Sequence, residues 1–328
     1  MNRRHALQLA VSAVVAAHAS PIWAQAAAAG LRRVGVLAPS TRVKEEITLK
    51  PFFDQMRELG WIEGQNVVYD RVYAEDRHHD LPRLAAELVA RRPELIYAPP
   101  QIAAMAARQA TRTTPIVFAT GMDPVGAGLA SSLAHPGGNV TGVVSVIDSL
   151  APKRLELLRE ILPNAKRIGL LGDPSDPRLN IERAALASVA NARGLTIVVA
   201  EASNPVELDA AVAKLLGQGV AVILGTTSIS TNLRGRLVEL ASRGRLPVVG
   251  GIAAMADAGA LFAYGAPLAD QLRRSAQLVD KVLKGAKSAD LSIEQPTLFE
   301  LVVNLKTAKA LGITIPRSIV LRADRVIE

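Results

Sequence analysis

Small polar residues and turn residues follow several short apolar runs of this chain. The runs are rich in Val, Ile and Leu, which is typical of buried strands. The residues that follow them are Ser40, Thr41, Pro100, Gln101, Gly121 and Asp123 in the first half, and Asp173, Ser175, Asn180, Thr226, Thr227 and Ser228 in the second half. Such a set offers hydroxyls, carboxylates and free backbone N–H groups to a small polar molecule. We therefore take these positions as candidate ligand-binding residues.

The chemistry of this set suits a zwitterion or a small carboxylate. Helices predicted to begin after Pro100 and Thr227 would present N–H donors and a positive dipole end to a carboxylate. Asp123 or Asp173 would accept a hydrogen bond from an ammonium group. The alternative for each residue is that it caps a helix or shapes a turn. For Asp123, a turn-bracing role is an equally supported alternative.

Several other chemistries find no support in the sequence. The chain has no Cys, which excludes thiol catalysis, disulfides and cysteine metal sites. The stretch His78-His79-Asp80 has no third ligand at useful spacing, so we interpret it as a solvated loop before a helix that Asp80 is placed to cap. Gly126-Ala127-Gly128 is a poor dinucleotide motif, and no G-x-S-x-G nucleophile motif occurs. We expect no cofactor, no metal and no enzymatic activity.

Strands that alternate with helices are predicted around these residues. Among the helices are PFFDQMRELGW, QIAAMAARQA, NIERAALASVANARG and a single helix over TNLRGRLVELASRG. The second half repeats the order of the first at a nearly constant offset, so that Val34 matches Ile168 and Leu95 matches Val222. This alternation predicts an α/β protein with two Rossmann-like lobes, each built on a parallel sheet.

Two such lobes define a domain organisation with a hinge. We expect residues 31–145 plus 267–295 in the first lobe and residues 150–264 plus 299–328 in the second, with three crossovers between them. Ligands of open parallel sheets bind beyond the carboxyl ends of the strands. Two of these edges that face each other would form a cleft, as in a hinged binding protein.

The first residues indicate export. Arg3 and Arg4 form a positive n-region, residues 6–17 form an apolar stretch, and Ala24-Gln25-Ala26 is a small-x-small cleavage pattern. The apolar run is too short for a bilayer span, which needs about 20 residues. We expect residues 1–26 to be a signal peptide, cleaved near Ala26, and the mature protein to be periplasmic.

The net charge of the chain is +8. The basic residues are scattered beside acidic ones, as in LRRSAQLVDKVLKGAK, and they form neither a cluster nor an aromatic-rich stripe. A solvated surface explains this pattern better than a nucleic-acid interface does. We expect no nucleic-acid partner.

Three stretches carry a family resemblance over nearly all of the mature chain. They are FFDQMRELGWIEGQNVVYDRVYAED, PIVFATGMDPVGAGLASSLAHPGGNVTGV and SIEQPTLFELVVNLKTAKALGITIPRSIVLRADRVIE. Together they resemble the ABC transporter substrate-binding proteins of the family that includes tryptophan- and phenylalanine-binding members. The resemblance implies a type I periplasmic-binding-protein fold and delivery of a small solute to a membrane permease. The turn after the first strand, APSTRVKEE, lacks the His-Pro of amino-acid-binding relatives. The resemblance therefore does not identify the ligand.

Three functions remain in view. The first is a monomeric, exported solute receptor of an ABC importer that closes around an amino acid or small carboxylate and docks on the permease. The second is a periplasmic sensory binding protein that feeds a membrane receptor. The third is an α/β enzyme that acts on a nucleotide or sugar phosphate. The export signal and the duplicated lobe favour the first.

Overall fold

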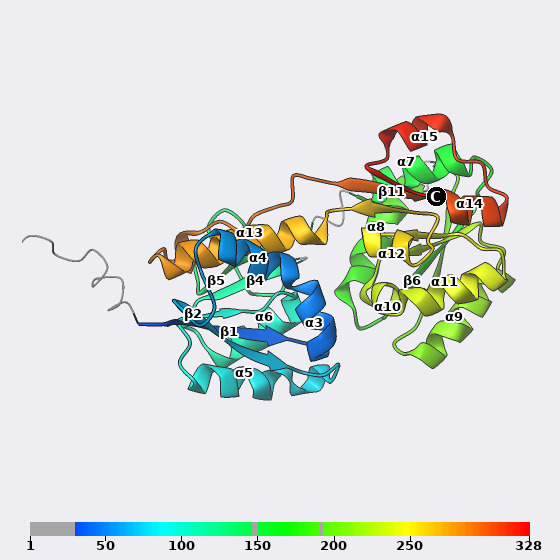
Figure 1. The fold of residues 1–328 in the computed structure, drawn as a ribbon. Helices are drawn as coiled ribbons and strands as arrows, with labels where there is room; N and C mark the ends of the chain where they lie inside the picture. Colours follow the sequence, from blue (N-terminus) through cyan, green and yellow to red (C-terminus); the bar gives the residue numbers. More distant parts are fainter. Residues whose placement is uncertain (1–29, 122, 146–149, 191–192) are drawn as a thin grey trace, which may run out of the picture.

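The predicted alternation of strands and helices builds two lobes, each around its own sheet (Figure 1). The computed structural model describes residues 30–121, 123–145, 150–190 and 193–328. The predicted signal peptide, and residues 146–149 of the first predicted crossover, lie outside the described residues.

The sheet of the first lobe is five-stranded and parallel throughout, with the order β2-β1-β3-β4-β5. Its strands are β1 (Arg32–Ala38), β2 (Val67–Tyr73), β3 (Leu95–Tyr97), β4 (Ile116–Gly121) and β5 (Val140–Val144). Successive residues point to opposite faces of a strand. In β1, Val34 and Val36 accordingly pack on one face of the sheet, and Leu37 packs on the other.

Helices cover both faces of this sheet. One face carries α4 (Lys50–Glu58) and α13 (Leu268–Leu283), and the other carries α5 (Leu81–Ala90) and α6 (Gln101–Ala110). The helix α13 packs in the first lobe although its sequence follows the strands of the second. Shorter elements are α3 (Arg42–Thr48) and the 3-10 turns η1 (His78–Asp80) and η3 (Ser288–Asp290).

The sheet of the second lobe repeats the first and extends it. Its order is β12-β11-β10-β9-β8-β6-β7, and the part β7-β6-β8-β9-β10 has the same topology as the first sheet. The strands are β6 (Arg167–Gly172), β7 (Thr196–Glu201), β8 (Val222–Gly225), β9 (Val248–Gly250), β10 (Phe262–Gly265), β11 (Glu300–Asn304) and β12 (Arg325–Ile327). The strand β11 runs antiparallel to β10, which departs from a purely parallel sheet.

Two groups of helices enclose this second sheet. One face carries α7 (Ala151–Ile161), α8 (Pro177–Ala190), α14 (Leu305–Leu311) and α15 (Arg317–Arg322). The other face carries α9 (Pro205–Gly217), α11 (Arg234–Arg243) and α12 (Ala253–Asp257), while the short α10 (Ser228–Asn232) follows β8. Among the described residues, no helix is long and apolar enough to cross a membrane.

The chain runs between the lobes after β5, after β10 and before β11 (Figure 1). After α13 it lies along β5, where Glu294 pairs with Val143 in a parallel bridge, before it enters β11. The hydroxyl of Ser145, just past β5, donates a 2.7 Å hydrogen bond to Gln271 of α13. This bond ties the start of one crossover to the helix that follows another. The residue-level lobe boundaries stay a prediction.

Three local predictions are wrong in detail. The turn APSTRVKEE contains the helix α3, and the single helix over TNLRGRLVELASRG is divided into α10 and α11 at Leu233. Asp80 makes no side-chain cap to α5; its carboxylate instead pairs with Arg77 at 3.0 Å and lies 3.6 Å from Arg83. Charged neighbours on the same turn compete with the backbone for that carboxylate.

Candidate functional site

The candidate residues lie at the carboxyl ends of strands that are neighbours in each sheet. In the first lobe they follow β1, β3 and β4, and in the second lobe they follow β6 and β8, which pair directly. Figure 1 shows the arrowhead of β1 and α3 on the side of the first lobe that faces the second. It also shows α8 and α10, which follow β6 and β8, on the side of the second lobe that faces the first.

In the first lobe, Ser40 belongs to a polar cluster with Asp76, Lys44 and Glu45. Its hydroxyl donates to Asp76 at 2.8 Å, and Lys44 pairs with the other carboxylate oxygen of Asp76 at 2.9 Å. The backbone N–H of Ser40 donates to Glu45 at 3.2 Å. Burial raises the pKa of Glu45, and the bond from Ser40 only partly opposes this. Thr41 precedes α3 without a side-chain cap bond, so its half-buried hydroxyl is not committed to that helix.

Asp123 is exposed and braces a turn. Its Oδ1 accepts a 2.8 Å hydrogen bond from the backbone N–H of Gly126. A Cβ on Gly126 would lie 2.0 Å from Oδ2 of Asp123, so a larger residue there would displace this carboxylate from its place in the turn. The second oxygen, Oδ2, has no hydrogen-bond partner among the described residues. Asp123 therefore braces the turn through Oδ1, and its other carboxylate oxygen, Oδ2, is still available to a ligand.

The start of α6 lies beside the end of β4. Pro100 is the N-cap residue of α6, its carbonyl accepts from the N–H groups of Ala103 and Ala104, and it forms a bridge with Thr120. Gln101 is the first residue of the helix, and Gly121 is the last residue of β4. These candidates share one edge with Asp123.

In the second lobe, Asp173 is held in a local network. Its Oδ1 accepts from the N–H and the hydroxyl of Ser175, at 2.8 and 2.7 Å, and from the hydroxyl of Ser203 at 2.9 Å. Partial burial alone would raise the pKa of Asp173, but these hydrogen bonds lower it below its ordinary value. Asn180 was predicted to begin a helix; α8 begins earlier, at Pro177, so Asn180 lies exposed in its first turn.

At the start of the helix that follows Thr227, the first backbone N–H group is already hydrogen-bonded within the protein. The N–H of Ser228 donates to Oδ2 of Asp176 at 3.1 Å, and the buried hydroxyl of Thr227 donates to the carbonyl of Leu171 at 2.8 Å. At α10, one of the N–H groups expected to be free for a ligand carboxylate is therefore already bonded to Asp176. Sequence reasoning did not identify Asp176, and only its position after a strand could have indicated it.

A buried ion pair at the same edge was also missed. Arg154 of α7 is 3% exposed, and its Nη1 lies 3.0 Å from Oε1 of Glu182 in α8. Its Nε donates to the carbonyl of Tyr264, near the end of β10, at 2.9 Å. A signal was present in the sequence, because Arg154 occupies the apolar stripe that Ala151, Leu158 and Ile161 define along α7.

Thr226 lies beside this pair. Its hydroxyl oxygen is buried and has no hydrogen-bond partner among the described residues, as is also true of Oε2 of Glu182. Buried polar atoms are nearly always hydrogen-bonded in folded proteins. Two such unpartnered atoms lie at the carboxyl edge of the second sheet.

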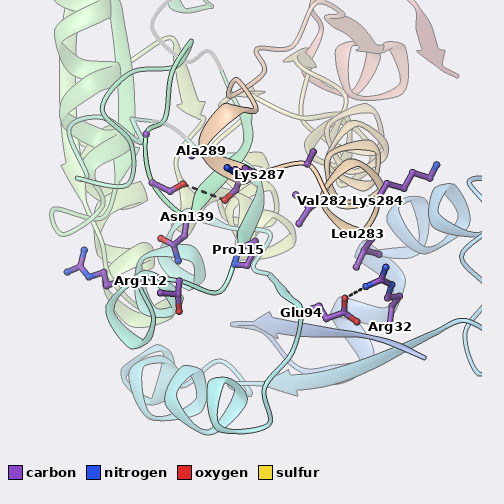
Figure 2. A pocket seen from close by; sticks show the side chains of 16 residues that line it. Arg32, Glu94, Arg112, Pro115, Asn139, Val282, Leu283, Lys284, Lys287 and Ala289 are labelled. Atoms are coloured by element: carbon purple, nitrogen blue, oxygen red, sulfur yellow. Dashed lines mark hydrogen bonds and ion pairs between the residues drawn. The ribbon is translucent and has the colours of Figure 1, made fainter. Parts of the chain in front are cut away.

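A further cavity in the described part of the chain lies elsewhere. It measures about 630 Å³ and opens in the first lobe (Figure 2). Its lining includes Arg32 at the start of β1, Pro115 just before β4 and Asn139 just before β5. These positions are at the amino ends of the strands, opposite to the candidate residues. Because ligands of parallel sheets bind at the carboxyl ends, we do not assign this cavity to the ligand.

Among the described residues, no group of three or more His, Asp or Glu side chains could hold a metal ion. The two facing edges instead offer hydroxyls, single carboxylates and one buried guanidinium. This arrangement suits the binding of a small polar solute.

The fold and these edges define a two-lobed solute-binding protein. Residues 35–327 match the family model of the ABC transporter substrate binding proteins, so the chain belongs to that family. It is 27% identical over 262 residues to the tyrosine-binding protein of Clostridioides difficile (strain R20291), a match that covers 80% of this chain and 75% of that protein.

Two solved structures have the same fold. An ABC domain from Streptococcus pneumonia in complex with L-Trp has a TM-score of 0.84 and 28% identity, covering 90% of this chain and 100% of its own. A conserved domain protein from Vibrio cholerae also has a TM-score of 0.84, with 27% identity over 90% of this chain and 99% of its own. The predicted family and fold class are confirmed.

Proposed function

We propose that this protein is the exported receptor of an ABC importer for an α-amino acid, with aromatic L-amino acids as the first candidates. The observation that carries the ligand class is the match, over 90% of the chain, to a structure that holds L-Trp. The tyrosine-binding relative points to the same class. The ligand leaves the receptor chemically unchanged.

Asp123 is our candidate for the ammonium group of this ligand. It is exposed, it follows β4, and one of its carboxylate oxygens has no partner among the described residues. Asp173 is a weaker candidate because its Oδ1 already accepts three hydrogen bonds. Thr41 and the first N–H groups of α6 supply further donors on the same lobe.

Closure of the two lobes over the ligand is the motion we propose. Three chain segments join the lobes, and such a hinge permits rotation while each sheet stays intact. A ligand that contacts both edges would favour the closed state by its differential affinity for it. The permease would recognise that closed state.

The test uses protein that has been unfolded, dialysed and refolded to remove any bound ligand. Isothermal titration with the twenty L-amino acids should give saturable binding of L-tyrosine, L-tryptophan or L-phenylalanine. Small-angle scattering should show a smaller radius of gyration with that amino acid present. Glucose and 3,4-dihydroxybenzoate serve as controls. Binding of a control together with failure of all twenty amino acids would refute the proposal.

Export to the periplasm as a monomer, with residues 1–26 removed, completes the proposal. N-terminal sequencing of periplasmic protein should show a start at or near Ala27, whereas an intact Met1 would contradict it. Mass spectrometry should recover the bound amino acid unaltered, which separates a receptor from an enzyme. Loss of amino-acid uptake when the neighbouring permease genes are deleted separates an importer from a sensory protein.

A further inference from the structure

Arg154 is held in one orientation by two hydrogen-bond partners at the carboxyl edge of the second sheet. Its Nε donates to the carbonyl of Tyr264, and its Nη1 pairs with Glu182, whose side chain is 1% exposed. Desolvation lowers the pKa of Arg154, and Glu182 opposes that shift. An arginine stays protonated in proteins, so a positive charge is fixed at this place.

The third nitrogen of the guanidinium, Nη2, has no partner among the described residues. It lies 3.3 Å from where a Cβ on Gly251 would stand and 3.7 Å from where a Cβ on Gly265 would stand. These glycines directly follow β9 and end β10. The absence of a side chain on Gly251 leaves a small opening beside Nη2, whereas the Cβ position of Gly265 is already taken by the carbonyl oxygen of Gly251, 1.8 Å away.

A second donor lies at the same opening. The Cα and Cβ of Thr226 are each 3.7 Å from the Cβ position of Gly251, and the Thr226 hydroxyl has no partner among the described residues. A guanidinium and a hydroxyl around one opening suit a carboxylate, which accepts two hydrogen bonds in a plane.

The charges around Arg154 favour a ligand without net charge. Glu182 and Asp176 are balanced by Arg154 and Arg178, whose guanidinium is under the electrostatic influence of both acids. A dianion would add uncompensated negative charge beside this cluster. A zwitterion brings its own ammonium, which Asp123 of the other lobe can accept.

We propose that Nη2 of Arg154, with the hydroxyl of Thr226, binds the carboxylate of the α-amino acid at the opening beside Gly251. This inference rests on the proposed function. It assigns the carboxylate to the second lobe and the ammonium to the first, so one ligand would hold the two lobes together.

The experiment compares each amino acid with its carboxamide. Isothermal titration uses L-tyrosine, L-tryptophan and L-phenylalanine, with L-tyrosinamide, L-tryptophanamide and L-phenylalaninamide, on the parent and on Arg154→Gln. In the parent, we expect the carboxamide of the bound amino acid to bind about ten- to a hundredfold more weakly, the range of one charge-assisted hydrogen bond. In Arg154→Gln, the difference should shrink to less than about threefold. A purely structural Arg154 would weaken both ligands equally and overturn the inference.

A second variant leaves the ion pair intact. Gly251→Ala places a methyl group beside Nη2 and should weaken binding of the amino acid by about tenfold or more while its carboxamide is affected less. Gly235→Ala is the matched control, since a Cβ on Gly235 meets nothing within 4 Å. Equal binding by the parent and Gly251→Ala would contradict the proposed opening. If the parent binds no amino acid at all, the proposed function fails and this inference falls with it.

Discussion

Oδ2 of Asp176 accepts a hydrogen bond from the backbone N–H of Ser228 at 3.1 Å, across 52 residues of sequence. Oδ1 of the same carboxylate accepts from the N–H of Arg178 at 3.0 Å. One side chain therefore satisfies backbone donors at the start of two helices, α8 and α10. It joins the segments that follow β6 and β8 at the edge where we place the ligand.

Replacing Asp176 by Ala should destabilise the fold. Both backbone donors would lose a charged acceptor, and a hydrogen bond to a charged group contributes about 1.5–3 kcal/mol. We expect the free energy of unfolding, measured by urea denaturation, to fall by at least about that amount. Asp176→Asn keeps an acceptor oxygen and should cost less. An Ala variant as stable as the parent would show that water replaces both bonds without loss.

The contribution of Asp173 to stability should depend on pH. Its pKa is lowered in the folded protein, so the ionised form stabilises the fold above the ordinary value of 3.8, and that contribution is lost as the pH falls through the folded value. Asp173→Asn should therefore be less stable than the parent at pH 7 and 5, with a difference that narrows below about 3.8. Urea denaturation at pH 7, 5, 4 and 3 measures it. A difference that widens on acidification would reverse the sign and contradict the assignment.

Asp123→Asn separates the two roles of that residue. Asn retains the oxygen that accepts from Gly126 and removes the charge, so the midpoint of thermal unfolding should change little. If the carboxylate binds the ligand ammonium, affinity for the amino acid should fall by about ten- to a hundredfold in calorimetry. Unchanged affinity would leave Asp123 as a turn brace only.

The bond between Ser145 and Gln271 should stabilise the joint between the lobes. Gln271 is 3% exposed, so Ser145→Ala would leave its buried carbonyl oxygen without this donor. We expect a loss of about 1–3 kcal/mol in the free energy of unfolding. The double variant Ser145→Ala/Gln271→Ala measures the coupling, which should be about 0.5–1.5 kcal/mol. A coupling near zero would mean that the bond contributes nothing to the joint.

Local patterns in the sequence predicted most of the fold. The 3.6-residue period of QIAAMAARQA predicted α6 at its observed bounds, and the repeated strand order of the two halves predicted two similar sheets. These features depend on residues close in sequence or on a pattern that recurs, so no knowledge of distant contacts was needed. The strand ends that carry the candidate residues followed from the same pattern.

The tertiary structure alone decided which polar groups already have a hydrogen-bond partner. Asp176 reaches Ser228, and Arg154 reaches Glu182 and Tyr264, through contacts between elements that only packing brings together. The sequence therefore determined that polar residues gather at the carboxyl ends of two repeated sheets. The packing of α7, α8 and α10 on the second sheet decided that Asp176 accepts from the first N–H of α10. It also decided that Nη2 of the buried Arg154 has no partner among the described residues, because hydrogen-bond satisfaction depends on distance in space.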